Sequence, residues 1–244
     1  MSLLSKVEVT ITFPLGAIFH QDIVEGTYKQ FLKMIKRISC INIGSKCNNC
    51  SLGDNCQYYI ITGKNFSGYP GIIFKKELYQ EDIFTKNGDY TYDIYLIGNC
   101  ERYRGYVEIF FKEYLRYRLF GIDFLLKKIE YKQIENKYKN VNCLLIKTII
   151  ETTDFISAYN NMMHYYNTEY CCDYCFIDNI DSINSIKVID ERKVSLNTKV
   201  IRKKGYIYKI GLDEMFSSDL ELIGIGKYNY LGGGKFAFSS KDEK

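Results

Sequence analysis

Four cysteines between residues 40 and 56 have the spacing of a metal-binding loop. Cys40, Cys47, Cys50 and Cys56 follow the pattern C-x6-C-x2-C-x5-C in a stretch rich in glycine, asparagine and aspartate. Four thiolates suit a tetrahedral zinc ion, and they also suit an iron–sulfur cluster. We predict a structural zinc site, with an iron–sulfur cluster and four unrelated thiols as the alternatives. A closed four-thiolate site has no open coordination position, so we expect no chemistry at the metal.

A glycine-rich loop near the end of the sequence, GIGKYNYLGGG at 224–234, is a candidate for binding phosphate. It is not a dinucleotide-binding fingerprint, because Asn229 stands where the third glycine is needed, and it is not a P-loop, because Phe236 stands where serine or threonine is needed. Glycines adopt positive φ and let backbone N–H groups approach an anion closely. We predict contact with a phosphate backbone, and a structural hairpin turn is the alternative. The residues concerned are Gly224, Gly226, Lys227, Gly232, Gly233, Gly234 and Lys235.

A basic stretch precedes this loop. From Arg192 to Lys209 there are seven basic residues and no acidic one. On a strand, Arg202 and Lys204 share one face while Lys203 points to the other. Lysines commonly guard a solvated strand edge, which is the alternative interpretation. Beside a phosphate-binding loop, the same residues predict a track for a nucleic-acid backbone.

The whole chain is mildly basic and has enough apolar residues for a packed core. It has 244 residues, a net charge of +4 and 46% hydrophobic residues. This charge is compatible with nucleic-acid binding but does not require it. The N-terminal stretch alternates like a strand and lacks the apolar core of a signal peptide, and no apolar run of about 18 residues predicts a membrane span. We expect a soluble cytoplasmic protein with no membrane partner, whose nine cysteines are metal ligands or buried thiols.

Hydrophobic periodicity predicts a β-α-β-β-α-β unit in the first half of the chain. The first helix is expected to bury Phe31, Leu32, Ile35 and Ile38 on one face. Strands are expected at 6–13, 71–79, 90–98 and 120–131, and helices at 26–38 and 101–120.

The second half repeats this order after a polar stretch at 132–140. Strands are expected at 141–152, 182–190, 198–210 and 234–238, with a helix capped by Asp154 at 154–166 and a short helix or turn at 211–222. The predicted fold class is α+β, with tandem ferredoxin-like (RRM-like) βαββαβ domains at 1–135 and 136–244. The first domain carries the four-cysteine metal-binding insertion at 40–56, and the second carries the glycine-rich loop.

These features together resemble a known family over nearly the whole chain. The segment IRKKGYIYKIGLDEMFSSDLEL followed by IGIGKYNYLGGGKFAF, and the cysteine loop CNNCSLGDNCQYY, look like parts of the CRISPR-associated endoribonucleases of the RAMP superfamily, which process precursor crRNA. The run GGG at 232–234 departs from the family, which more often has an apolar residue between two glycines. No His-Tyr-Lys constellation stands out by spacing, so the catalytic residues are assigned separately.

The resemblance implies two RRM-like domains that bind CRISPR repeat RNA and cleave it without a catalytic metal. In such enzymes a ribose 2′-hydroxyl attacks the adjacent phosphate and leaves a 2′,3′-cyclic phosphate and a 5′-hydroxyl. The alternative is a non-catalytic RNA-binding RAMP subunit of a CRISPR effector complex. A zinc-stabilised protein-interaction module is a third possibility.

This chemistry needs a base, an acid and a cation. His20 lies between the first strand and the first helix, where the family often places catalytic groups, and Tyr28 in the first turn of the helix is its expected partner. His164, on the first helix of the second half, is the other histidine, with a packed or solvated role as its default. Lys29, Lys33 or Lys64 could supply the cation that stabilises the charge on the phosphate, and the sequence does not choose among them.

Overall fold

The computed structural model describes residues 4–41, 46–64, 68–77, 81–177, 187–197 and 202–238. The beginnings of two predicted strands, at 182–186 and 198–201, lie outside the described residues. Within the described residues, no helix is long and apolar enough to cross a lipid bilayer.

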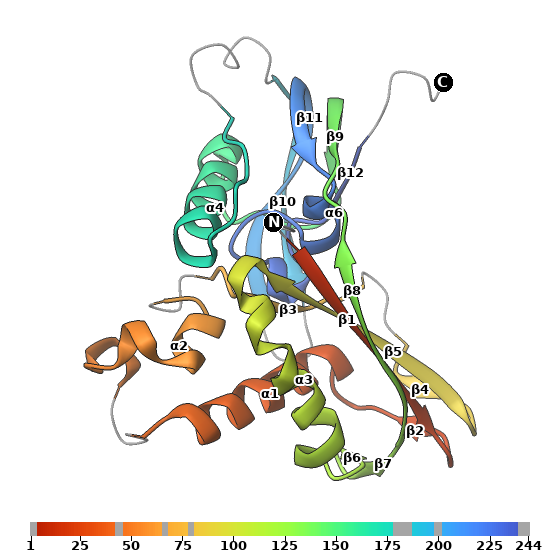
Figure 1. The fold of residues 1–244 in the computed structure, drawn as a ribbon. Coiled ribbons are helices and arrows are strands. Elements are labelled where there is room, and N and C mark those ends of the chain that lie inside the picture. The colour runs from red at the N-terminus through yellow and green to blue at the C-terminus, as the bar shows by residue number, and fades with distance from the viewer. Residues whose placement is uncertain are drawn as a thin grey trace.

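The first half forms a four-stranded antiparallel sheet with the strand order β3-β5-β1-β8. In chain order these strands are second, third, first and fourth, which is the arrangement of a ferredoxin-like unit. Helices α1 and α3 lie beside this sheet (Figure 1). The strands are β1 (Leu4–Phe13), β3 (Ile72–Phe74), β5 (Gly88–Ile97) and β8 (Leu125–Ile134), and the helices are α1 (Ile23–Ser39) and α3 (Arg104–Ile109), which continues as a π-helical turn (Phe110–Tyr114).

Short elements complete the first half. The strands β2 and β4 pair as a small ribbon, and β6 pairs with β7. Their bounds are β2 (Ala17–Ile18), β4 (Ile83–Phe84), β6 (Arg118–Leu119) and β7 (Ile122–Asp123), and the cysteine loop holds two 3₁₀ turns (Cys47–Asn49, Gly53–Asn55) and α2 (Gln57–Ile61). A further 3₁₀ helix, Gly98–Tyr103, leads into α3.

The second half repeats the topology in a second antiparallel sheet, ordered β10-β11-β9-β12. Again the order along the chain is second, third, first and fourth, so the tandem ferredoxin-like fold predicted from the sequence is confirmed. The elements are β9 (Tyr138–Ile146), α4 (Phe155–Tyr170), β10 (Lys187–Asn197), β11 (Arg202–Ser217), α6 (Asp219–Ile223), a 3₁₀ turn (Asn229–Leu231) and β12 (Phe236–Phe238).

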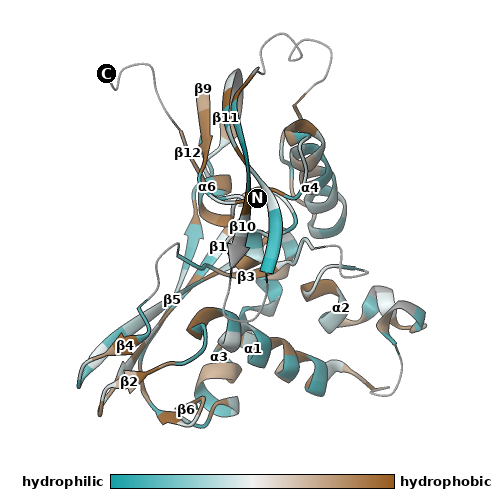
Figure 2. Cartoon of the chain, turned by 180° about the vertical axis from the view of Figure 1, so that it is seen from behind, coloured by the Kyte–Doolittle hydropathy of each residue, from teal (hydrophilic) through white to brown (hydrophobic). Residues whose placement is uncertain are grey.

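Two helix starts follow from local sequence. The side chain of Asp22 accepts a hydrogen bond from the backbone N–H of Glu25, and Asp154 accepts one from Ser157 at the start of α4, as predicted. Helix α1 buries Tyr28, Phe31 and Met34 among others, and its turns alternate between hydrophobic and hydrophilic residues (Figure 2). Ile38 was expected on this buried face but is 53% exposed, because the last turn of α1 extends past the sheet (Figure 1).

Two other predictions about elements are confirmed only in part. The polar stretch 132–140 contains the junction between the halves, but Lys132–Ile134 belong to β8 and pair with β1, and β9 begins at Tyr138. The stretch 211–222 was expected to be a short helix or turn, and α6 begins within it at Asp219, but β11 continues through its first part to Ser217 and pairs with β9. In both places the ladder of backbone hydrogen bonds to a neighbouring strand outweighs polar local composition.

Candidate functional site

The glycine loop, residues 224–234, is folded tightly into the protein. Its five glycines are buried, and four of them have positive φ. A Cβ at Gly234 would overlap the carbonyl oxygen of Ile225, and one at Gly233 would lie 2.6 Å from the Cβ of Tyr228. These close approaches and dihedral angles are available to glycine and not to larger residues. The glycine density of this loop is therefore explained by packing.

Most backbone N–H groups of the glycine loop donate to acceptors within the protein. The N–H of Gly233 donates to the carbonyl of Tyr228 at 2.8 Å, and that of Gly234 donates to Ile149 at 2.9 Å. The N–H of Lys227 donates to the carboxylate of Glu151 at 3.0 Å. Most N–H groups of the folded loop are therefore already used and do not form an open anion-binding site. Contact between its glycines and a phosphate backbone stays a prediction.

The glycine loop joins the two halves of the molecule. Its Tyr230 ring lies 6.2 Å from the Tyr28 ring of α1. Gly232 packs against the side chain of Lys76, and the space at Gly68 is closed by the side chain and carbonyl of Lys227. The loop thus brings residues from the C-terminal end of the chain against the first helix and the segment around β3.

A cluster of lysines gathers where the glycine loop meets the first half. Lys235 forms a 3.4 Å ion pair with Glu77, which also pairs with Lys75 at 2.8 Å. Lys76 pairs with Asp22, the residue that caps α1. Burial lowers the pKa of Lys235, the nearby Lys75 and Lys76 lower it further, and Glu77 opposes them. We call Lys75, Lys76 and Lys235 the lysine cluster.

The lysine cluster carries more positive than negative charge. Its three lysines face the two carboxylates of Asp22 and Glu77. Lys75 and Lys76 were missed by the sequence analysis, which considered Lys29, Lys33 and Lys64 as the cation. The one available signal was the pair of lysines directly after the apolar run GIIF.

His20 is exposed and lies two residues before Asp22, at the N-terminal end of α1. Through Asp22 and Lys76 it is connected to the glycine loop, although it is more than 200 residues away from that loop in sequence. His164 is also exposed, but on α4 in the second half. Along the backbone, His20 is thus two residues from Asp22, the partner of Lys76 in the lysine cluster.

Tyr28, the predicted partner of His20, is 6% exposed. Burial raises the pKa of its phenol well above the usual value, so the group is a neutral hydroxyl at physiological pH. Of the predicted cations, Lys29 pairs with Glu25 and Lys64 pairs with Glu169, and Lys33 is exposed.

The basic strand lies beside the glycine loop. Arg202 and Lys204 are exposed at the start of β11, and Lys203 between them is half-buried. The ammonium of Lys203 lies 5.5 Å from the centre of the Tyr228 ring, within the range of a cation–π contact. The structure thus brings the basic strand and the glycine loop together.

The open face of the first sheet is, in contrast, neutralised by its own ion pairs. Lys6 lies 2.9 Å from Glu8 and 2.7 Å from Asp93. Lys132 lies 3.6 Å from Glu8 and 3.3 Å from Glu130. Lys6 and Lys132 therefore offer an anionic ligand little uncompensated positive charge on this face.

The four cysteines of the predicted metal site line one small cavity of about 20 Å³ together with Gly53, Tyr58 and Tyr59. All four are free thiols and half-buried. Their donor type fits zinc, but among the described residues no group of three or more His, Cys, Asp or Glu side chains is arranged to hold a metal ion. The metal site stays a prediction. In the stretch CCDYC, Cys172 is buried while Cys171 and Cys175 are exposed.

Comparison with known proteins identifies the fold. No protein-family model matches the chain, and no curated protein sequence matches it. Among solved structures, a product complex of Cas6 from Thermus thermophilus matches with a TM-score of 0.50 and 8% identity, over 96% of this chain and 99% of that one.

Two further solved structures match over similar lengths. A Cas6-related protein from Pyrococcus furiosus gives a TM-score of 0.48 at 16% identity, over 97% of this chain and 99% of that one. A structure described as CRISPR associated protein Cas6 gives 0.45 at 16% identity, over 97% and 100%. With the topology above, the likeness to the Thermus structure shows that this chain has the tandem ferredoxin-like fold of that Cas6 structure.

Proposed function

We propose that this protein is an endoribonuclease that binds CRISPR repeat RNA and cleaves precursor crRNA. The observation that carries the proposal is the lysine cluster, which gathers beside the glycine loop from two distant parts of the chain and pairs with Asp22, two residues after His20. Partly buried lysines in excess over carboxylates favour an anionic ligand, and a phosphate is the anion that an RNA provides. The fold is that of a protein whose solved structure is a Cas6 product complex.

The proposed reaction is attack of a ribose 2′-hydroxyl on the adjacent phosphorus. A base removes the proton of the 2′-hydroxyl, the bond from phosphorus to the 5′-oxygen breaks, and an acid protonates that oxygen. The products are a 2′,3′-cyclic phosphate and a 5′-hydroxyl. His20 serves one of the proton transfers, since imidazole titrates near neutral pH. The lysine cluster stabilises the negative charge that builds up on the phosphate oxygens.

The decisive experiment uses a repeat RNA with one 2′-deoxy nucleotide just 5′ of the scissile phosphate. We expect this RNA to bind normally and to remain uncut, because its nucleophile is missing, while the unmodified RNA is cut even in excess EDTA. His20→Ala should slow single-turnover cleavage by roughly 10²-fold at unchanged affinity, and His164→Ala, the matched control, should cut normally. Cleavage of the deoxy RNA would exclude the mechanism. Binding of the unmodified RNA without any cleavage would indicate a non-catalytic subunit.

We also propose that Cys40, Cys47, Cys50 and Cys56 hold a structural zinc ion. The support is that four free thiols from a loop with little apolar content face one cavity. Metal binding would stabilise this loop, and structural zinc sites contribute on the order of 10 kcal/mol. Elemental analysis should find about one zinc ion per chain. Cys47→Ser should lose it and melt at a lower temperature, while Cys175→Ser should retain it. Protein that contains neither zinc nor iron would contradict the proposal.

A further inference from the structure

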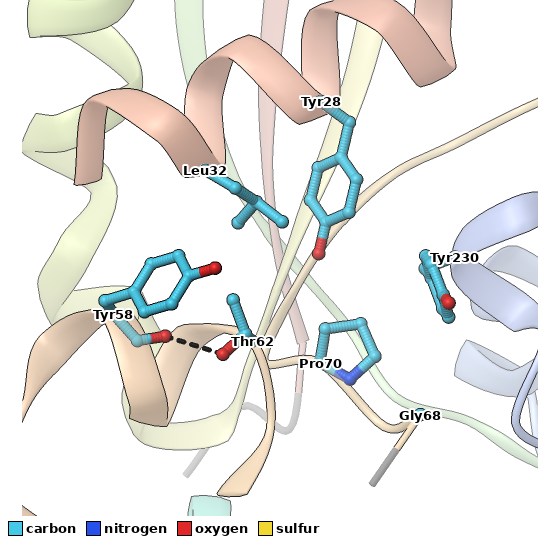
Figure 3. A pocket seen from close by; sticks show the side chains of 7 residues that line it. All are labelled: Tyr28, Leu32, Tyr58, Thr62, Gly68, Pro70 and Tyr230. Carbon is cyan, nitrogen blue, oxygen red and sulfur yellow. Dashed lines mark hydrogen bonds between the residues drawn. The ribbon is translucent and has the colours of Figure 1, made fainter. Parts of the chain in front are cut away.

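A pocket of about 170 Å³ lies between the two halves and was not anticipated from the sequence. It is walled by α1, by the end of α2, by residues 68–70 and by the glycine loop, and Figure 3 shows the side chains that face it. We call it the tyrosine pocket, and its lining residues are Tyr28, Leu32, Tyr58, Thr62, Gly68, Pro70 and Tyr230.

The size of the tyrosine pocket limits what it can hold. Pockets for drug-sized ligands measure about 300–1,000 Å³, so this one has room for about one ring system. Its walls include three aromatic rings. Tyr28 and Tyr230 pack against each other with their centroids 6.2 Å apart, and Tyr58 lies across the space from Tyr28 (Figure 3). Flat aromatic walls favour a flat aromatic ligand, because π-faces stack without regard to its exact substituents.

The polar groups of the pocket are suited to the edge of a base. The hydroxyls of Tyr28 and Tyr58 point into the space between α1 and α2 (Figure 3). Within the described part of the chain, neither the Tyr28 nor the Tyr230 hydroxyl has a hydrogen-bond partner. A phenol both donates and accepts, so these two groups can pair with the edge of any nucleobase.

Positive charge lies at the rim of the pocket. The exposed Lys227 packs against Gly68, which lines the pocket, and Lys76 packs against Gly232, close to Tyr230 in the glycine loop. A base held in the pocket would thus have at least the exposed Lys227 close to a neighbouring phosphate. A free apolar ligand would gain nothing from these lysines, whereas one nucleotide of an RNA chain would.

We propose that the tyrosine pocket binds one unstacked nucleobase of the RNA. This rests on the proposed function, since the base belongs to the RNA that the protein binds. Proteins generally recognise single-stranded RNA by stacking unstacked bases on aromatic side chains. The pocket would fix the register of the RNA relative to the lysine cluster, because both adjoin the glycine loop, the pocket through Tyr230 and the cluster through Lys76.

The test removes bases from the RNA and fills the pocket in the protein. A set of repeat RNAs, each with one abasic position, is titrated against the full chain by fluorescence anisotropy at constant salt. Leu32→Trp places an indole in the pocket. Ile38→Trp makes the same change on the same helix at an exposed position outside the tyrosine pocket, and is the matched control.

We expect one abasic position to weaken binding about tenfold or more, as loss of a stacked base does. Leu32→Trp should weaken binding of the intact RNA to a similar extent, and it should show no further loss with that one abasic RNA. Such non-additivity places the missing base in the filled pocket. Ile38→Trp should bind as the unaltered protein does.

Two results would overturn the base pocket while the proposed function stands: normal RNA affinity in folded Leu32→Trp, or losses that add at every abasic position. If Leu32→Trp does not fold, the double variant Tyr28→Phe, Tyr230→Phe keeps the shape of the pocket and removes its two hydroxyls. It should then weaken binding of the intact RNA several-fold, and unchanged affinity would overturn the proposal. Absence of any RNA binding by the unaltered protein would overturn both proposals.

Discussion

At the scale of single residues, Asp219 is unusual because it is an acidic side chain buried in the protein without a hydrogen-bond partner among the described residues. It is fully buried at the start of α6, and within the described residues neither carboxylate oxygen has a hydrogen-bond partner. Burial raises the pKa of this carboxyl to about 6. The interior therefore disfavours the charged form relative to water, because an unpaired buried charge loses its hydration, and the carboxyl becomes charged only above about pH 6.

Asp219→Asn should stabilise the protein at alkaline pH. The folded pKa lies above the unfolded value of about 3.9, so the folded state binds more protons between these values. Stability therefore falls as pH rises from about 4 to 6 and stays reduced above. Asparagine has no charge to bury, so the variant should gain about 1–2 kcal/mol at pH 8 and little at pH 4.5.

Urea unfolding at the two pH values measures this difference. Asp154→Asn serves as the comparison, because hydrogen bonds from Ser157 lower the pKa of the Asp154 carboxyl and its charged form stabilises the fold. That variant should not gain stability at pH 8. Equal effects of Asp219→Asn at both pH values would show that the carboxyl is not a buried charge.

At the scale of elements, the glycine loop is the part of the fold least able to accept a side chain. Gly234→Ala should lower the free energy of unfolding by more than about 2 kcal/mol, since its φ is +63° and a Cβ would overlap the carbonyl of Ile225. Gly105→Ala, in α3 with nothing within 4 Å of its Cβ, should leave stability unchanged or raise it by about 0.5 kcal/mol. Thermal unfolding of both variants measures the contrast, and a tolerated alanine at 234 would refute the packing explanation.

At the scale of the whole molecule, we expect RNA to follow the lysines near the glycine loop, Lys203 and Lys227, and not the ion-paired face of the first sheet that includes Lys132. Lys203→Gln and Lys227→Gln should each make RNA binding less dependent on salt. The slope of log affinity against log salt should shrink by about 0.7 for each phosphate that the variant no longer neutralises. Lys132→Gln, in the ion pairs of the first sheet, should leave the slope unchanged. Titrations at several salt concentrations measure the slopes, and a larger change for Lys132→Gln would move the RNA path to that sheet.

The sequence by itself determined the order of the main elements and the cap of α4. Alternation in β1 and the helical spacing of Phe31 and Ile35 depend on residues a few positions apart, so local pattern was sufficient to predict two ferredoxin-like units. The Asp154 cap is equally local. The sequence also marked the glycine loop and the basic strand, although it did not show that the loop's N–H groups are paired internally.

Only the tertiary structure decided which distant residues meet. Lys235 pairs with Glu77, and Tyr28 meets Tyr230, across about two-thirds of the chain or more. No local periodicity encodes such contacts, because they depend on how the two sheets and the glycine loop pack once folded. The same reason explains β11, whose polar end at 211–217 is a strand because β9 pairs with it. Residues that are neighbours in the sequence largely determine the helices and strands. The lysine cluster and the tyrosine pocket, in contrast, form only when the two halves of the chain pack together.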